Sequence, residues 1–226
     1  MNHIIIIGNS GAARECYWLF QTMLDASPLL ASEYDFGGFL SWEQYKGDLK
    51  NLQHLFLGDI ANHIINQGNL YVIGIGAPRL RKEVYEYCKR KRANFFTLRH
   101  PLSDINPSAH IGEANIFQGA STVFCDAQLG NANYLNGAVN LSHDANVGNY
   151  NFFGPFSLVL GDSYVGDENM FATRCTVLPH ARVGNMNIIA PYSVVYKGCG
   201  NGERVAGNPA LCIGKCLNAA NQGKGL

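Results

Sequence analysis

The chain has 226 residues, which is enough for one or two domains with a substantial core. Seventeen lysines and arginines balance seventeen aspartates and glutamates, so the composition gives no electrostatic basis for binding nucleic acid. The seven cysteines are scattered and odd in number, which predicts free thiols in a reducing compartment; Cys212 and Cys216 have no further ligand at zinc-binding spacing.

Residues 1–100 alternate between strand and helix patterns, which predicts a small parallel, Rossmann-like α/β sheet. The first apolar run is short and leads straight into a glycine loop, so we expect neither a signal peptide nor a membrane span. We therefore expect the protein to be cytoplasmic. Strands are expected at residues 4–7, 36–40, 70–75 and 95–98, and helices at 12–24, 60–66 and 79–91. In the first helix, Trp18 and Leu19 are expected to face inward. The basic run at 89–92 fits the solvated last turn of a helix.

The loop at residues 8–11, Gly-Asn-Ser-Gly, follows the first strand and precedes the first helix. Backbone N–H groups and a helix N-terminus at such a place suit a phosphate or a ribose. The loop lacks the full G-x-G-x-x-G pattern and the Lys-Ser/Thr of a P-loop, and no acidic residue clearly ends the second strand. A purely structural turn is therefore the alternative.

The rest of the chain is dominated by a six-residue period, because an apolar residue occupies every sixth position from Ile105 to Val195, sixteen in all. This period fits neither an α-helix nor strands of an open sheet. It predicts a solenoid in which three short strands per eighteen-residue coil form a triangular parallel β-helix. The spacing alone does not decide the handedness.

Three further columns recur within the repeat. A glycine column predicts a turn that needs a positive φ or has no room for a Cβ; its members are Gly112, Gly130, Gly148, Gly166 and Gly184. An asparagine column predicts a second turn with amides hydrogen-bonded along the axis; its members are Asn115, Asn133, Asn151, Asn169 and Asn187. Mostly small residues two positions before each large apolar residue would let a narrow core close.

A narrow, filled solenoid has no interior cavity, so a reactive site must lie outside it. His143 stands one coil below Gly161, which leaves space for a ligand, and beside Asp144, with Asp162 one coil above. A histidine with a carboxylate partner is a typical general base near neutral pH. The alternative is an unreactive, solvent-facing histidine. We interpret the other solenoid histidines as structural; they are His100, His110 and His180.

The hexapeptide run and the V-A-G-N-P-A segment at residues 205–210 resemble the left-handed β-helix acyltransferases. Nearly the whole chain is similar to the sugar O-acyltransferase, sialic acid O-acetyltransferase family. That family includes sugar-nucleotide N-acetyltransferases of the bacillosamine and 4-amino-4,6-dideoxysugar pathways. The matching stretches are residues 8–15, 38–40, 75–76 with Arg81, 106–109 and 142–148.

The resemblance implies a left-handed helix, a homotrimer, and acetyl-CoA bound between adjacent helices, with no metal. It implies a Rossmann-like sugar-nucleotide domain at residues 1–100, an acetyltransferase domain at 101–210 and a C-terminal tail at 211–226, of which 218–226 would be frayed. By this resemblance His143 is the base, Asp144 is its acidic neighbour and Gly161 lies near the thioester. The residues matched to the coenzyme site are Thr173, Ala190 and Pro191. Those matched to the sugar-nucleotide loop are Ser10, Gly11 and Ala12.

Two positions depart from the family pattern. Relatives often carry a second histidine nine residues after the base, where this chain has Phe152. Relatives also often follow Gly-Phe-x with two aspartates that contact the nucleotide base, where this chain has Ser41 and Trp42. The contact to the acetyl oxygen and the identity of the nucleotide therefore stay open.

The leading hypothesis is acetyl transfer from acetyl-CoA to the amine of a nucleotide-linked amino-deoxysugar, as in O-antigen or glycan biosynthesis, with neither nucleic acid nor membrane as a partner. O-acetylation of a sugar hydroxyl, as on sialic acid, would use the same base. A hydratase of the γ-carbonic anhydrase type needs three histidines converging on zinc, and the columns contain no such set. A non-catalytic scaffold is the remaining alternative.

Overall fold

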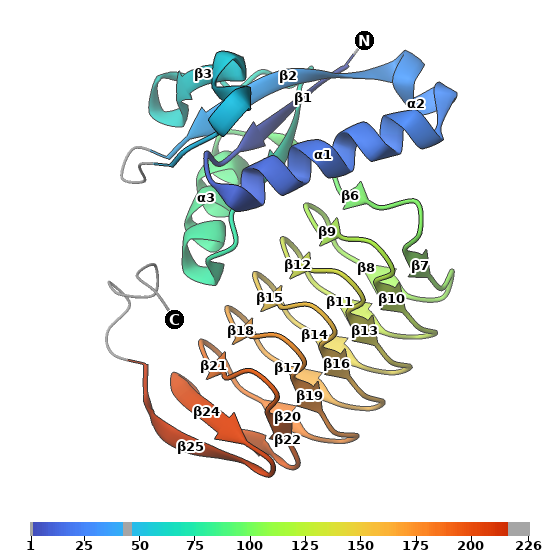
Figure 1. Cartoon of the computed structure of the whole chain (residues 1–226), viewed down its shortest axis with the longest axis vertical. Coiled ribbons are helices and arrows are strands. Elements are labelled where there is room, and N and C mark those ends of the chain that lie inside the picture. Colours follow the sequence, from blue (N-terminus) through green and yellow to red (C-terminus); the bar gives the residue numbers. More distant parts are fainter. Residues whose placement is uncertain (1, 43–46, 217–226) are drawn as a thin grey trace.

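The computed structural model, which describes residues 2–42 and 47–216, places an α/β unit against one flank of a column of stacked coils (Figure 1). The α/β unit is built on a five-stranded parallel sheet with strand order β3-β2-β1-β4-β5. Its strands are β1 (Asn2–Ile7), β2 (Tyr34–Ser41), β3 (Phe56–Asp59), β4 (Leu70–Ile73) and β5 (Asn94–Phe95). No described helix is both long and apolar enough to cross a membrane.

The central strand β1 reads as a continuous apolar run because helices cover both faces of the sheet. Ile4 and Ile6 pack with the buried residues of α1 (Gly11–Ala26), whereas Ile5 and Ile7 pack with those of α3 (Pro78–Arg90). All four isoleucines are at most 3% exposed. The alternation of side chains along one strand therefore joins the two helical layers to one sheet.

The α/β unit differs from the sequence prediction in several elements. Trp18 is 55% exposed, so its predicted inward orientation is wrong; the buried face of α1 follows Ala13, Cys16 and Leu19 at helical spacing, and Trp18 falls outside it. The helix expected at 60–66 is only the 3-10 turn η2 (Ile60–Asn62). The unpredicted elements are α2 (Pro28–Glu33), η1 (Lys50–Leu55) and strand β3.

The strand expected at residues 95–98 is divided between the two parts of the structure. β5 pairs with β4 in the α/β sheet, whereas β6 (Leu98–Arg99) pairs with β9 (Ile116–Phe117) at the first coil of the solenoid. A single apolar run thus serves as the connection, because each end finds a different parallel partner.

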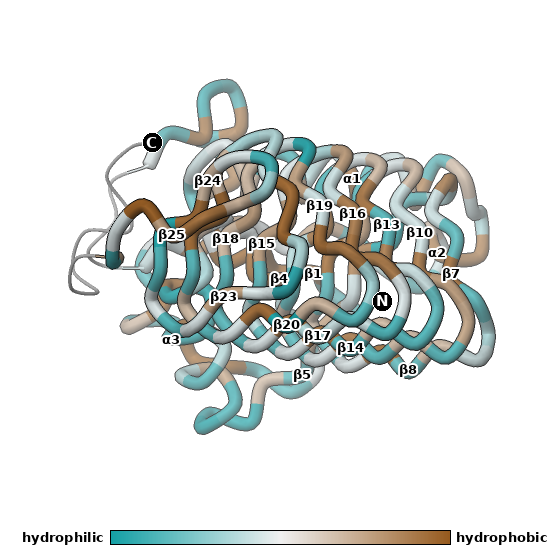
Figure 2. The backbone as a smooth tube through the Cα atoms, turned by 90° about the horizontal axis from the view of Figure 1, so that it is seen from below, coloured by the Kyte–Doolittle hydropathy of each residue, from teal (hydrophilic) through white to brown (hydrophobic). Residues whose placement is uncertain are grey.

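The solenoid consists of three sheets, here called sheets I, II and III (Figures 1 and 2). Their strands recur every eighteen residues up to residue 195, and all are parallel except the last strand, at residues 210–215. Sheet I contains β6, β9 (Ile116–Phe117), β12 (Tyr134–Leu135), β15 (Phe152–Phe153), β18 (Met170–Phe171), β21 (Ile188–Ile189), β24 (Glu203–Gly207) and β25 (Ala210–Lys215). Sheet II contains β7 (Asp104–Ile105), β10 (Thr122–Val123), β13 (Asn140–Leu141), β16 (Leu158–Val159), β19 (Thr176–Val177) and β22 (Val194–Val195). Sheet III contains β8 (His110–Ile111), β11 (Gln128–Leu129), β14 (Asn146–Val147), β17 (Tyr164–Val165), β20 (Arg182–Val183) and β23 (Gly198–Cys199).

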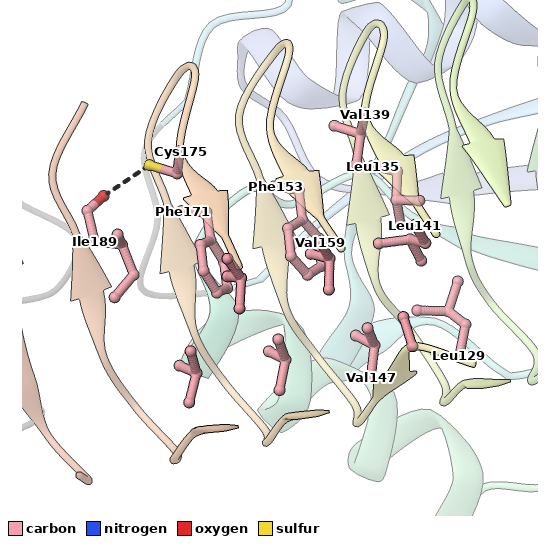
Figure 3. Packing of buried hydrophobic residues seen from close by; sticks show 14 of the residues in the cluster. Leu129, Leu135, Val139, Leu141, Val147, Phe153, Val159, Phe171, Cys175 and Ile189 are labelled. Atoms are coloured by element: carbon pink, nitrogen blue, oxygen red, sulfur yellow. Dashed lines mark hydrogen bonds between the residues drawn. The ribbon is translucent and has the colours of Figure 1, made fainter. Parts of the chain in front are cut away.

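The predicted hexapeptide columns form the core of the solenoid. In the two-residue strands the second residue points inward, so that Leu141 lies against Val159 and Phe153 against Phe171 in the next coil (Figure 3). The rings of Phe153 and Phe171 stack with centroids 4.8 Å apart. Small side chains such as Cys175 fill the corners between these layers, as predicted.

The glycine column is needed for space and not for a positive φ. A Cβ on Gly130 would lie 2.7 Å from the Gly148 carbonyl oxygen and 2.5 Å from Asn149 Oδ1. The left-handed residue of this corner is instead the one before each asparagine, such as Ala132 with φ 51°. Of the two explanations offered by the sequence, lack of room for a Cβ is therefore correct.

The asparagine column forms the predicted ladder along the axis. Asn133 Nδ2 donates to Asn115 Oδ1 at 3.2 Å, and its backbone N–H donates to the same oxygen at 2.7 Å. The pattern repeats at Asn151 and Asn169, and these side chains are fully buried. The ladder satisfies amides that would otherwise be unpaired inside the corner.

The C-terminal segment does not begin as a tail. β25 pairs antiparallel with β24, with Gly207 opposite Ala210. Residues 210–215 are therefore strand, where the sequence predicted a polar tail from residue 211. The expected fraying of residues 218–226 lies outside the described residues.

The α/β unit covers sheet I and the corner between sheets III and I. The outward residues Ile116, Tyr134 and Phe152 of sheet I join the apolar cluster on the α1 side. On the α3 side, Lys82 pairs with Glu168 at 2.6 Å and Lys89 pairs with Glu113 at 2.5 Å. Sheet II, the outer face of sheet III and the corner between them lie away from these contacts.

Candidate active site

His143 lies at the corner between sheets II and III, in the turn that joins β13 to β14. Its Nδ1 is 2.8 Å from Asp144 Oδ2. Because an ionised carboxylate only accepts hydrogen bonds, this contact places the proton of the neutral imidazole on Nδ1. Nε2 is then left with a lone pair that can accept a proton.

The aspartates of this corner have a conformational origin. Asp126, Asp144 and Asp162 occupy the same position in three successive coils and have φ values of 59°, 57° and 57°. Aspartate tolerates this left-handed conformation better than most residues. The turn therefore accounts for an aspartate at each coil, and what distinguishes Asp144 is its hydrogen bond to His143.

The imidazole of His143 lies against Gly161 of the next coil. A Cβ on Gly161 would come within 2.6 Å of His143 Cε1 and 2.8 Å of Nε2. Residues with side chains occupy the same column at Cys125 and Pro179, so the glycine is required by the ring and not by the turn. The Gly161 N–H donates no hydrogen bond to any residue in 2–42 or 47–216, and Gly161 itself is buried with the ring packed against it.

The carboxylates change the proton affinity of the ring. The hydrogen bond that His143 donates to Asp144 is the main factor that raises the pKa of His143, and the charges of Asp144 and Asp162 add to it against the opposing effect of desolvation. One donor atom from each of these three exposed side chains lies within 4.8 Å of the others. The arrangement favours an imidazole that takes up a proton readily.

The residues expected along the coenzyme lie at a different corner of the same chain, between sheets I and II. Thr173 and Pro191 occupy one column, and Thr173 Oγ1 donates to the Pro155 carbonyl oxygen at 3.0 Å. Ala190 is next to them, where its N–H donates to the Val205 carbonyl oxygen at 2.8 Å. One chain therefore does not bring these three residues to the His143 corner.

The loop that contains Ser10, Gly11 and Ala12 lies in the α/β unit, at the carboxyl end of β1. The strand order reverses between β1 and β4, and such a switch point is where open parallel sheets bind ligands. The loops after these two strands touch, because a Cβ on Gly8 would lie 2.4 Å from the Gly74 carbonyl oxygen. Ser10 is the N-cap residue of α1, and its side chain accepts no capping hydrogen bond from the first turn of the helix.

The two departures from the family pattern have structural roles. Phe152 packs against Tyr134, with ring centroids 5.3 Å apart, and borders Gly76 of the α/β unit, so it lies in the contact between unit and solenoid. Ser41 is 9% exposed at the end of β2. Trp42 packs edge-on against Tyr87, with centroids 5.3 Å apart.

One charged residue that the sequence analysis left without a role is fully buried. The Arg81 guanidinium lies 5.3 Å from the centre of the Tyr134 ring and donates no hydrogen bond to a described residue. Burial lowers the pKa of Arg81 to about 10. The signal was present in the sequence, because Arg81 shares the apolar face of α3 with Val84 and Cys88.

The arrangement of stacked eighteen-residue coils attached to a parallel α/β sheet is similar to that of several solved acetyltransferase structures. A variant of perosamine N-acetyltransferase from Caulobacter crescentus, solved with CoA and GDP-perosamine, has a TM-score of 0.83 at 19% identity, covering 95% of this chain and 98% of that one. The acetyltransferase domain of PglB from Neisseria gonorrhoeae has a TM-score of 0.81 at 19% identity, covering 94% and 100%.

WeeI from Acinetobacter baumannii is similar to the same extent, with a TM-score of 0.80 at 18% identity, covering 94% of this chain and 100% of that one. No family model and no curated protein matches the sequence. The likeness therefore confirms the predicted fold, an α/β unit followed by a left-handed parallel β-helix, over nearly the whole chain.

Proposed function

We propose that this protein is an acetyl-CoA-dependent N-acetyltransferase that acts on the amine of a nucleotide-linked amino-deoxysugar. The observation that carries the proposal is the His143 corner, where Asp144 orients the ring and the missing Cβ of Gly161 leaves room for the ring itself. The similarity to solved structures of perosamine N-acetyltransferase with CoA and GDP-perosamine supports the same class of substrates.

The chemistry follows from the free Nε2 of His143. A sugar amine is largely protonated at neutral pH and attacks only as the free amine, so a neighbouring base assists the loss of its proton. In the proposed reaction Nε2 takes a proton from the amine while nitrogen bonds to the thioester carbonyl carbon; the carbon–sulfur bond then breaks and coenzyme A leaves. The Gly161 N–H, which has no partner among the described residues, is the proposed donor to the carbonyl oxygen as negative charge develops there.

A homotrimer would complete the site. Thr173, Ala190 and Pro191 lie at another corner than His143, so acetyl-CoA can meet both sets only between two copies of the chain. Exposed large apolar residues support such contacts on sheet II and its two corners; they are Phe124, Phe156, Leu158, Tyr192 and Tyr196.

The α/β unit would hold the nucleotide at its switch point. Ser10, Gly11 and Ala12 are the proposed contacts, because they follow the central strand where α1 begins. In this assignment residues 1–100 are the sugar-nucleotide domain and 101–210 the acetyltransferase domain. The seven cysteines are all free, which supports a cytoplasmic enzyme.

The test uses purified wild-type protein, His143→Ala and His143→Asn with acetyl-CoA and a panel of UDP-, dTDP- and GDP-linked 4-amino-sugars. We expect acetylation of one acceptor by wild type and a loss of kcat of at least about 100-fold in both variants, the usual size of a general-base contribution. Wild-type turnover in both variants would refute the base assignment. A matched hydroxyl sugar in place of the amino sugar distinguishes O-acetylation from N-acetylation.

A further inference from the structure

A hollow on the outer face of sheet III, next to the His143 corner, has no role in the assignments above. Its rim is formed by the outward side chains of three successive coils, His110, Gln128 and Asn146, which are all exposed. Its floor includes Gly112, Gly130 and Gly148 of the glycine column. The hollow thus exists because three coils in a row place a glycine beside an outward polar residue.

The hollow ends where the outward column changes character. The next coil places Tyr164 at the same position, where it is 41% exposed, and Arg182 of the following coil lies 6.0 Å from the centre of its ring. This aromatic ring therefore follows Asn146 in the outward column, one coil beyond the residues that line the hollow. Such a ring can pack against the C–H face of a sugar.

Two of the three polar side chains on the rim, Gln128 and Asn146, are neutral amides. Asn146 Nδ2 donates to Gln128 Oε1 at 3.4 Å, which holds the two amides together. Gln128 Nε2 and Asn146 Oδ1 make no hydrogen bond to a described residue, so one donor and one acceptor remain. The lining contains neither Lys and Arg nor Asp and Glu. Hydroxyl groups suit this set, whereas a phosphate would need cations or a cluster of free N–H groups.

The hollow lies between the His143 corner and the contact of the solenoid with α3. Asn146 is in the same coil as His143 and three residues after it, so the reactive corner forms one border. At the other border, Glu113 follows Gly112 and pairs with Lys89 of α3 in the α/β unit. The hollow therefore lies next to the proposed base, while its other border meets the C-terminal end of α3.

We infer that the hollow is the subsite for the sugar ring of the acceptor, with Gln128 and Asn146 bonding its hydroxyls and Tyr164 packing against the ring. The inference rests on the proposed function for the identity of the acceptor. It assigns sugar recognition to the solenoid and leaves the nucleotide to the α/β unit.

A binding experiment tests the subsite without catalysis. The melting temperature of the full chain is measured with the nucleotide diphosphate alone and with the corresponding nucleotide-linked amino sugar, for wild type and for Gln128→Ala/Asn146→Ala. We expect the nucleotide to shift both proteins equally, and the additional shift from the sugar to be lost in the double variant. An additional shift of wild-type size in the double variant would overturn the inference.

Kinetics provide the second measurement. The double variant should raise KM for the acceptor about tenfold or more, as expected for two lost neutral hydrogen bonds, and leave KM for acetyl-CoA unchanged. Gln67→Ala, which removes an exposed amide from a turn before β4, should change neither constant. An unchanged acceptor KM in the double variant would reject the subsite even if the His143 variants are inactive. Active His143 variants would refute the proposed base but not the sugar-dependent melting shift.

Discussion

At the scale of single residues, the distinctive feature is an exposed histidine whose two ring nitrogens have different environments. Nδ1 faces Asp144, and the side of the ring that carries Nε2 faces Gly161. The carboxylate sets the tautomer and raises the pKa, while the glycine sets the position of the ring. These two influences can be separated by substitution.

Asp144→Asn should move the acid limb of the pH profile. A base works only when unprotonated, so activity falls as the pH decreases through the pKa of His143, which Asp144 raises. Without the carboxylate that pKa decreases, and the acid limb of kcat/KM should shift to lower pH, with a lower plateau because the ring loses its orientation. Asp126→Asn, which alters the same turn position one coil below, should leave the profile unchanged. A profile for Asp144→Asn that coincides with wild type would contradict the assigned pairing.

Gly161→Ala should displace the imidazole without unfolding the chain. The backbone there has an ordinary φ, and the three atoms nearest to the added methyl group all belong to the ring, with Cε1 at 2.6 Å. A displacement of a catalytic group by about 1 Å can reduce kcat about 100-fold. Gly119→Ala, whose Cβ would meet its nearest atoms at 3.6 Å, is the matched control, and circular dichroism checks the fold of both. Equal kcat values for the two variants would show that the position of the ring is not critical.

At the scale of structural elements, the asparagine ladder replaces the hydrogen bonds that short strands cannot provide at the corner. Asn151 Nδ2 donates to the Gly166 carbonyl oxygen at 2.9 Å and to Asn133 Oδ1 at 3.1 Å, and Asn151 Oδ1 accepts from the Asn169 N–H at 2.8 Å. One side chain therefore connects three successive coils.

Asn151→Ala should decrease the free energy of unfolding by about 3 kcal/mol, because it leaves several buried groups without partners at about 1–3 kcal/mol each. Urea titration followed by circular dichroism measures the change. Asn94→Ala removes a single exposed hydrogen bond, to the Gln67 carbonyl oxygen at 2.8 Å, and should cost less than about 1 kcal/mol. Similar losses in both variants would mean that the ladder adds nothing beyond ordinary hydrogen bonds.

At the scale of the whole molecule, the α/β unit covers sheet I and leaves sheet II with exposed apolar side chains. Leu158, on the outer face of sheet II, is 37% exposed. Under the trimer proposal Leu158→Glu should convert trimers into monomers by light scattering and decrease acetyl transfer, because a charge would be buried in the contact. Leu29→Glu, on α2 and 73% exposed, should keep the wild-type mass and activity. A trimer that survives Leu158→Glu would place the interface elsewhere.

The parts of this protein that could be predicted from sequence are those that depend on a fixed period. If each coil stacks on the preceding coil with an offset of eighteen residues, three features follow. They are the core columns, the amide ladder and the closeness of His143 to Gly161. The α/β unit has no such period, and there the predictions failed at Trp18 and at residues 60–66. Those outcomes depend on which face a helix presents and on whether β3 forms beside β2, which local patterns do not determine.

The sequence by itself determined the solenoid and its reactive corner, because backbone pairing between identical coils converts spacing along the chain directly into distance. Only the tertiary structure decided that Phe152 and Arg81 belong to the contact between unit and solenoid, that β25 turns back along β24, and that a polar hollow remains open beside His143. These features depend on which flank of the prism the α/β unit covers, and that is determined by packing between residues far apart in the chain.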